Sequence, residues 1–108
     1  VFVTAPRPTW KWEEQFGLAY VEAQACGLPV VTTRCGSNEE AIAPGNDLIS
    51  DYSVEAIADK IIYWLTHRTE RTAQGEANAV WARTNHDLLT QCRAMGQAFT
   101  DIEALNGR

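Results

Sequence analysis

Two apolar, strand-type runs constrain the fold of this 108-residue chain more than any other feature of its sequence. Val1 to Ala5 is an apolar run of the kind that is normally found inside a sheet. Leu28 to Thr33 shows no alternation between polar and apolar residues, which indicates a strand that is covered on both faces, as in a parallel sheet. We predict a third, short strand at Leu48 to Ser50.

The first helix is predicted between the first two strands. It should begin near Phe16 or Gly17 and end at about Cys26. Gly27 fits the position just past a helix end, and Pro29 follows two residues later.

Two capping patterns predict the next helices. Ser37 to Glu40 has the S-x-x-E form of a capping box and is expected to open a short helix through Ile42. Ser53 is expected to cap an amphipathic helix. Its apolar positions are Val54, Ile57, Ala58, Ile61, Ile62 and Leu65.

The C-terminal part is predicted to be helical from about Arg68 to Arg83 and again in a last helix. The residues expected to face inward in the first of these are Ala73, Ala77, Val80 and Trp81. The last helix carries one narrow apolar stripe, suited to docking on a neighbour, at Leu88, Cys92, Met95, Phe99 and Ile102. The order of strands and helices is that of an α/β protein with a parallel sheet. Three strands make a small sheet, and the chain opens on a core-type strand without Met, so we expect a segment of a longer protein.

The composition argues against several function classes. The net charge of −5, with scattered Lys and Arg, argues against nucleic-acid binding. No apolar run approaches the length of a membrane span, and there is no signal-peptide pattern. Three cysteines without close pairing suggest reduced thiols, and neither they nor the two histidines have metal-ligand spacing.

Two glutamates mark the candidate site. The first helix is apolar almost all round and should be largely buried, yet Glu22 lies in its middle, where a carboxylate is costly unless paired or used. The helix should start at the carboxyl edge of the sheet, where ligands bind and where free N–H groups favour phosphate. Gly17 would let a ligand approach the backbone closely. Glu14, in the preceding loop, could reach a different part of the same extended ligand.

A long motif surrounds these glutamates. It consists of Glu14-Gln15-Phe16-Gly17-Leu18, Glu22-Ala23, Ala25-Cys26-Gly27-Leu28-Pro29-Val30-Val31, Thr33, Gly36 and Glu40-Ala41-Ile42. This region resembles the E-x7-E signature of retaining GT-B glycosyltransferases, which include sucrose, glycogen and mannosyl transferases. The resemblance covers residues 1–65, and residues 66–108 fit the family's closing helices only in pattern. It implies that residues 1–108 are the C-terminal part of the nucleotide-sugar-binding lobe, a Rossmann-like parallel-sheet lobe followed by C-terminal helices.

The resemblance also implies roles for the matched positions. Glu14 would contact the donor sugar near the reacting carbon, and Glu22 would accept hydrogen bonds from the ribose hydroxyls. The turn whose backbone amides face the sugar and diphosphate would be formed by Phe16, Gly17 and Leu18. Gly36 is a further candidate, although Ser37 stands where the family often has a second glycine.

By resemblance, the complete enzyme would be a hexosyltransferase. It would move a hexose from a nucleoside diphosphate sugar to a hydroxyl acceptor, such as a sugar or a lipid-linked glycan, with retention at the anomeric carbon. No metal or other cofactor is expected, because the helix dipole and basic side chains would stabilise the leaving diphosphate. Those Arg and Lys residues and the N-terminal acceptor lobe match nothing here, so we expect this chain alone to be inactive.

Simpler explanations stand beside these roles. Taken alone, Glu14 would be a solvated loop carboxylate and Glu22 a partner in a buried salt bridge. The capping box explains Glu40 as well as a ligand role does. Trp10 and Trp12 fit a hydrophobic loop anchor better than acceptor stacking.

Two other function classes compete with the glycosyltransferase interpretation. The alternative to an enzyme is a non-catalytic nucleotide-binding or interaction module. A nicotinamide-dependent enzyme is disfavoured, because no G-x-G-x-x-G follows a strand. For the complete protein we expect a cytoplasmic location, or a peripheral one at the membrane.

Overall fold

Three parallel strands form the centre of the fold, in the order β1-β2-β3. The computed structural model describes residues 1–107. The strands are β1 (Phe2–Val3), β2 (Val30–Thr33) and β3 (Asp47–Ile49). A parallel sheet whose strands alternate with helices confirms the predicted α/β class.

The middle strand, β2, is the core of the sheet. All four of its residues are buried, as the lack of alternation in the sequence predicts. The first strand is shorter than predicted. It covers only Phe2–Val3, whereas the prediction was Val1 to Ala5. Within residues 1–107 it lies at the sheet edge, paired only with β2, and Val3 is 40% exposed.

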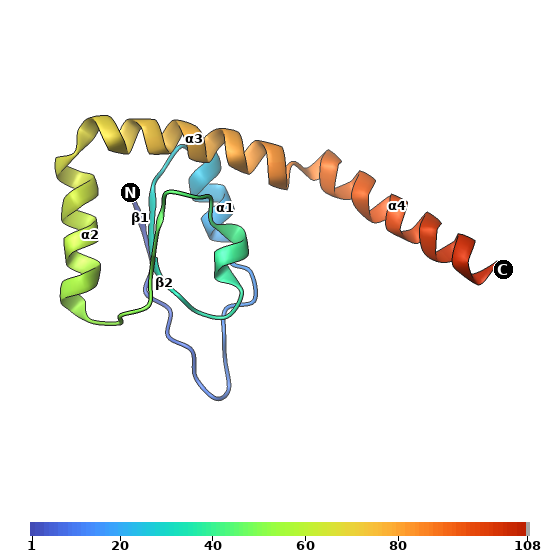
Figure 1. The fold of residues 1–108 in the computed structure, drawn as a ribbon, viewed down its shortest axis with the longest axis horizontal. Coiled ribbons are helices and arrows are strands. Elements are labelled where there is room, and N and C mark those ends of the chain that lie inside the picture. The colour runs from blue at the N-terminus through green and yellow to red at the C-terminus, as the bar shows by residue number, and fades with distance from the viewer. Residues whose placement is uncertain (108) are drawn as a thin grey trace.

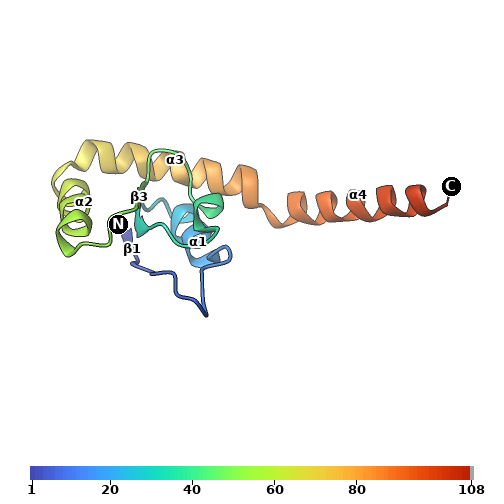
Figure 2. The same ribbon diagram turned by 60° about the horizontal axis from the view of Figure 1, so that its bottom comes forward.

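The helices surround the sheet on two sides and at one end. In Figures 1 and 2, helix α1 (Leu18–Ala25) and helix α2 (Val54–Thr66) flank the strands, and α3 (Arg68–His86) crosses one end of the sheet. A short 3₁₀ helix, η1 (Asn38–Ala41), connects β2 to β3. The last helix, α4 (Leu88–Asn106), extends away from the rest.

Helix α1 matches its predicted position but is buried on one face only. The buried residues are Tyr20, Val21, Ala23 and Gln24. The hydroxyl of Tyr20 lies 3.0 Å from that of Thr4 and 3.2 Å from that of Thr32, which joins the helix to the sheet. Glu22 is exposed on the opposite face, so the prediction of a buried carboxylate is wrong. The reason is that, in residues 1–107, α1 packs against β2, η1 and α3 with one side alone.

Helix α3 also buries a face different from the predicted one. Ala73, Ala77 and Val80 are exposed and Trp81 is half-buried, whereas Gly75, Asn78 and Ala82 are buried. The sequence pattern favoured the more apolar stripe. Instead, α3 approaches the turn after α1 so closely that a Cβ at Gly75 would collide with the carbonyl of Gly27.

Two amide side chains, the buried Asn78 and the partly buried Asn46, hold α3 against the amino end of the sheet. Asn46 and Asn78 exchange two hydrogen bonds, of 2.8 and 2.9 Å. The Asn78 amide also donates to the Leu28 carbonyl, and the Asn46 side-chain oxygen accepts from the backbone N–H of Val30. These groups satisfy one another away from water, which is the condition for burying them without a large cost.

Helix α2 confirms its predicted cap, because the Ser53 hydroxyl accepts from the backbone N–H of Ala56. The predicted apolar face is partly wrong. Its exposed members are Val54, Ile62 and Leu65. Trp64 is buried instead, and its indole N–H donates to the Asp47 carboxylate at 2.6 Å.

Helix α4 buries no residue, and its predicted stripe is exposed to solvent. Within residues 1–107, no helix is both long enough and apolar enough to cross a membrane.

Candidate functional site

The candidate site lies at the carboxyl ends of β1 and β2. Two loops leave the sheet there, residues 4–17 after β1 and residues 34–37 after β2. Figure 1 shows the first of these, in blue, reaching beyond the sheet before the chain turns back into α1. As predicted from the strand–loop–helix order, the start of α1 and the Glu14 loop are on this edge.

The two loops are joined through Glu14. The backbone N–H of Ser37 donates to the Glu14 carbonyl at 3.0 Å. Gly36 has a φ of +56°, and a Cβ there would collide with the same carbonyl. A glycine is therefore required at Gly36 by both conformation and space. The loop after β2 thus fixes the backbone that carries Glu14.

Gly17 forms the boundary between the Glu14 loop and α1. It is the N-cap residue, with a φ of +82°, and a Cβ there would collide with the ring of Tyr20. The same Cβ position is 3.5 Å from the carboxyl carbon of Glu14, so this side chain lies beside the start of the helix. Backbone conformation and Tyr20 account for the glycine, and close approach of a ligand stays a prediction.

Glu22 belongs to the exposed face of α1. Leu18, Glu22 and Cys26 follow the i, i+4, i+8 spacing of one helix face, and all three are exposed. A buried salt bridge at Glu22 is therefore wrong. Within residues 1–107, the carboxylates in ion pairs are those of Glu39 and Asp47. Within the described residues, Glu14 and Glu22 therefore form no ion pair, and their role toward a ligand stays a prediction.

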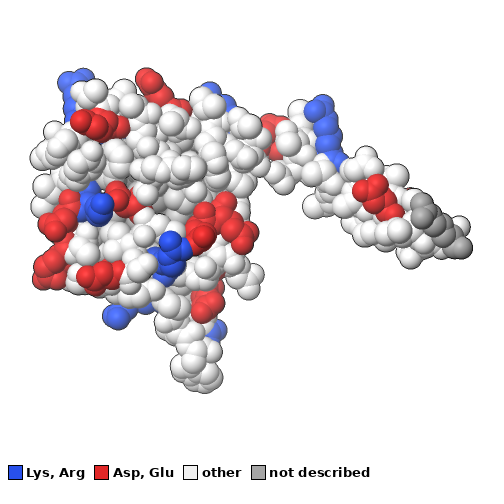
Figure 3. All heavy atoms as spheres, viewed as in Figure 1, with Lys and Arg blue, Asp and Glu red and all other residues white. Residues whose placement is uncertain are grey.

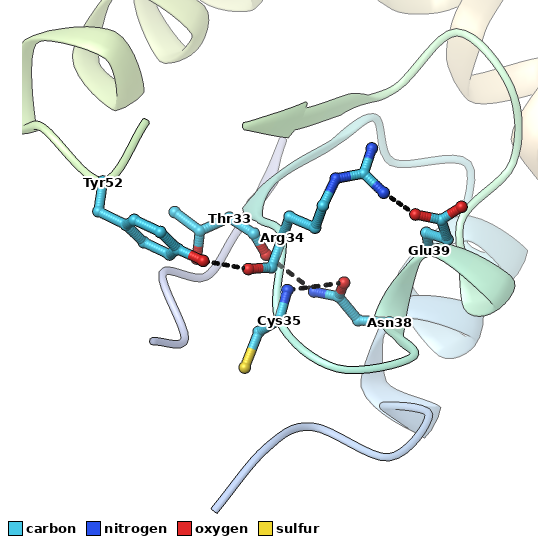
Figure 4. A network of polar contacts seen from close by, with 6 residues as sticks. All are labelled: Thr33, Arg34, Cys35, Asn38, Glu39 and Tyr52. Atoms are coloured by element: carbon cyan, nitrogen blue, oxygen red, sulfur yellow. Dashed lines mark hydrogen bonds and ion pairs between the residues drawn. The ribbon is translucent and has the colours of Figure 1, made fainter. Parts of the chain in front are cut away.

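A polar network fixes the loop after β2 (Figure 4). The Asn38 side chain donates to the Thr33 carbonyl at 2.9 Å and accepts from the N–H of Cys35 at 3.2 Å. The Tyr52 hydroxyl donates to the Arg34 carbonyl at 2.5 Å. The Arg34 guanidinium pairs with Glu39, and both side chains are about half exposed.

The predicted capping box at Ser37 is wrong. The Ser37 side chain makes no capping hydrogen bond, and the helix it precedes is a 3₁₀ turn. A capping box would need the Ser37 N–H for the Glu40 side chain, but this group donates to Glu14. Asn38 supplies the local bonds instead. The capping explanation of Glu40 thus fails, and a ligand role for this exposed residue stays a prediction.

One aromatic contact at the site has no signal in the sequence. The ring of Phe16 meets His86, at the end of α3, with centroids 5.5 Å apart. Trp81 packs on the same imidazole at 4.9 Å. Phe16 and His86 are far apart in the chain, and neither stands in a periodic pattern. The contact attaches the motif loop to α3 and directs the Phe16 side chain toward the protein.

The tryptophans of the first loop are exposed. Trp10 is 89% exposed and Trp12 is 50% exposed, so the prediction that they anchor the loop to the core is wrong.

In residues 1–107, no cluster of three or more His, Cys, Asp or Glu side chains could hold a metal ion.

Comparison with known proteins places this chain within a family. The family described as "Glycosyl transferases group 1" matches residues 1–81. A GDP-mannose-dependent monoacylated alpha-(1-6)-phosphatidylinositol monomannoside mannosyltransferase of Corynebacterium glutamicum is 31% identical over 90 residues, which are 82% of this chain and 23% of that protein. A D-inositol 3-phosphate glycosyltransferase of Mycolicibacterium smegmatis is 33% identical over 103 residues, 90% of this chain and 23% of that protein. The chain thus spans about a quarter of the length of these relatives. It belongs to the group 1 glycosyltransferase family.

Proposed function

We propose that this chain is part of the donor-binding lobe of a retaining hexosyltransferase. The complete enzyme would move a hexose from a nucleoside diphosphate sugar to a hydroxyl acceptor, such as a sugar or a lipid-linked glycan. One observation carries the proposal. Glu14 is held by the loop after β2 beside the start of α1, while Glu22 is exposed farther along the same helix.

The start of α1 suits a diphosphate. The first backbone N–H groups of a helix lack partners within it, and the helix dipole favours an anion there. In the proposal, the amides of residues 16–18 face the sugar and diphosphate. Glu22 lies about one turn into the helix, at about 1.5 Å per residue, so it would reach the ribose beyond the diphosphate.

Glu14 would act at the sugar end. As the bond from the anomeric carbon to the diphosphate oxygen breaks, positive charge develops on the sugar ring. A carboxylate fixed nearby stabilises that charge in the transition state. The leaving diphosphate would be neutralised by the helix dipole and by basic residues in the rest of the complete protein, with no metal ion or other cofactor.

For the complete protein, we propose a cytoplasmic location, or a peripheral one at the membrane.

The test is a transfer assay on the complete enzyme. GDP-mannose and UDP-glucose are offered as donors, and the anomeric configuration of the transferred sugar is determined by NMR. Retention of the donor's configuration is expected. An inverted product would contradict the mechanism. Nucleotide binding without transfer or donor hydrolysis would indicate a binding module. Transfer by residues 1–108 alone would contradict the need for a second lobe.

A further inference from the structure

Residues 9–12, in the middle of the loop that carries Glu14, form an ordered turn with two exposed indoles. The backbone N–H of Thr9 donates to the Trp12 carbonyl at 2.8 Å, and the Thr9 hydroxyl accepts from the N–H of Trp12 at 3.0 Å and of Lys11 at 3.3 Å. These bonds close residues 9–12 into a turn. Figures 1 and 3 show that this part of the chain protrudes beyond the sheet.

Both tryptophans are exposed to solvent within residues 1–107. Trp10 is 89% exposed and Trp12 is 50% exposed. Indoles contribute to stability mainly when their large apolar surface is removed from water. Two of them on one hydrogen-bonded turn do little for the fold of residues 1–107. Their placement suits a contact outside residues 1–107, either with the rest of the complete protein or with another molecule.

The position of the turn restricts that molecule. Trp12 precedes Glu14 by two residues, which can span at most about 7 Å between Cα atoms. The Glu14 backbone is fixed by the loop after β2. Whatever packs on Trp12 therefore lies close to the carboxylate that the proposed function sets beside the reacting carbon.

We propose that Trp10 and Trp12 form a stacking surface for the ring of a sugar acceptor. This inference rests on the proposed function and names an acceptor contact that it lacks. The face of an indole is negative, and the C–H bonds of a pyranose ring carry partial positive charge, so the two surfaces attract and exclude water. The indole N–H can donate to a ring hydroxyl at the same time.

Charge favours an uncharged sugar over a lipid surface. The loop holds two cations, Arg7 and Lys11, and two anions, Glu13 and Glu14, so its formal charges cancel. Both cations already lie over aromatic rings, Arg7 at 5.3 Å from the centroid of Tyr52 and Lys11 at 4.4 Å from that of Trp10. Attraction to an anionic membrane depends on an excess of Lys and Arg, which neither this loop nor the chain, with its net charge of −5, provides.

Saturation-transfer difference NMR on the complete enzyme, with nucleoside diphosphate bound, tests the proposal. The probes are methyl α-D-mannopyranoside and methyl α-D-glucopyranoside. We expect saturation to reach the C–H protons of one pyranoside face in the unmodified enzyme. The double variant Trp10→Ala, Trp12→Ala should lose most of this signal, and Trp12→Phe, which keeps an aromatic face, should retain most of it.

Controls separate this proposal from its rivals. Phe99→Ala removes an exposed aromatic from α4 and should leave the pyranoside signal unchanged. An absent signal in the unmodified enzyme, or an equal signal in the double variant, would overturn the proposal. So would sedimentation with phosphatidylglycerol vesicles that depends on Trp10 and Trp12. Calorimetry measures binding of the nucleoside diphosphate separately. The affinity for the nucleoside diphosphate should be the same in the variants. If the unmodified enzyme does not bind the nucleoside diphosphate, that result counts against the proposed function instead.

Discussion

The two ends of the sheet differ in whether their polar side chains are hydrogen-bonded within the protein or exposed. At the amino end, Asn46 and Asn78 are bonded to each other and to backbone groups, and Asn78 is fully buried. At the carboxyl end, the side chains of Glu22 and Glu40 are exposed and Glu14 is half-buried beside the start of α1. Polar groups that are bonded within the protein complete the fold. The glutamates, of which Glu14 lies in a loop, Glu22 in α1 and Glu40 in η1, are instead candidates for contact with a ligand.

This contrast assigns different consequences to mutations at the two ends. A change at the amino end disturbs packing or leaves a buried group without its partner, so it should lower stability. A change of an exposed carboxylate at the carboxyl end should leave stability nearly unchanged and affect binding or catalysis. Measurements of melting temperature and kinetics on the same variants therefore test the contrast directly.

The largest effect is expected for Gly75→Ala at the amino end. The new Cβ would meet the backbone of Gly27, which cannot rotate away as a side chain would, so α3 must shift from α1. Overpacking of this kind costs up to about 3 kcal/mol. At about 2–4 °C per kcal/mol, a cost of about 1–3 kcal/mol should lower the melting temperature of the complete protein by about 2–12 °C.

A second glycine provides the matched control for this prediction. Gly96 lies in α4, where a Cβ would meet no atom within 4 Å. Alanine is favoured over glycine inside a helix by about 1 kcal/mol, so Gly96→Ala should be neutral or stabilising. If Gly75→Ala were as neutral or stabilising as Gly96→Ala, helix propensity would outweigh the contact with Gly27, and the expected collision would be contradicted.

Glu14→Gln should have the next largest effect, on catalysis. The variant keeps the shape and removes the charge that would stabilise the transition state. Loss of one fixed electrostatic contact lowers kcat by about two decades, or about 2.7 kcal/mol, with a smaller change in donor KM. Steady-state kinetics with varied donor measure both constants, and the melting temperature should stay the same. Full kcat would identify Glu14 as a solvated loop residue.

Glu22→Ala should weaken nucleotide binding by at least about tenfold, or about 1.4 kcal/mol. The physical reason is the loss of charge-assisted hydrogen bonds to ribose hydroxyls, each worth about 1.5–3 kcal/mol. Calorimetry with the nucleoside diphosphate is the measurement, and Glu55→Ala on α2 is a control with an exposed carboxylate elsewhere. Because Glu22 is exposed, a large fall in melting temperature would contradict the structure.

The sequence predicts the order of the elements well, because local signals determine them. The unbroken apolar run of β2, the glycine after α1 and the Ser53 cap each depend on neighbours in the chain. The candidate site was located in the same way, since Glu14, Gly17 and Glu22 belong to one continuous motif. Their proposed roles come from the resemblance to the family.

The failures come from contacts between distant segments. The face of α3 is decided by Gly27 and by Asn46, and a helical pattern cannot reveal either. The capping box at Ser37 failed because its N–H bonds to Glu14, which lies in another loop. The prediction that Glu22 is buried failed because an apolar helix of residues 18–25 can have fewer neighbours than its composition suggests.

The smallest effect is expected at an ion pair on the amino end of β3, where Lys60 lies 2.9 Å from Asp47. The hydrogen bond to Asp47 and the charge of that carboxylate raise the pKa of Lys60 above its ordinary value of 10.5, against a smaller opposing effect of burial. A raised pKa in the folded state means that the pair stabilises the protein fully below pH 10.5 and loses this contribution as the pH rises through the folded pKa. Because Lys60 is half exposed, solvent screening limits the contribution to about 0.5 kcal/mol.

Lys60→Met should therefore lower the melting temperature by about 1–2 °C between pH 6 and 9. The difference from the unmodified protein should vanish at more alkaline pH. A difference that stays the same at alkaline pH would show that the lysine stem contributes by packing and that the charge does not.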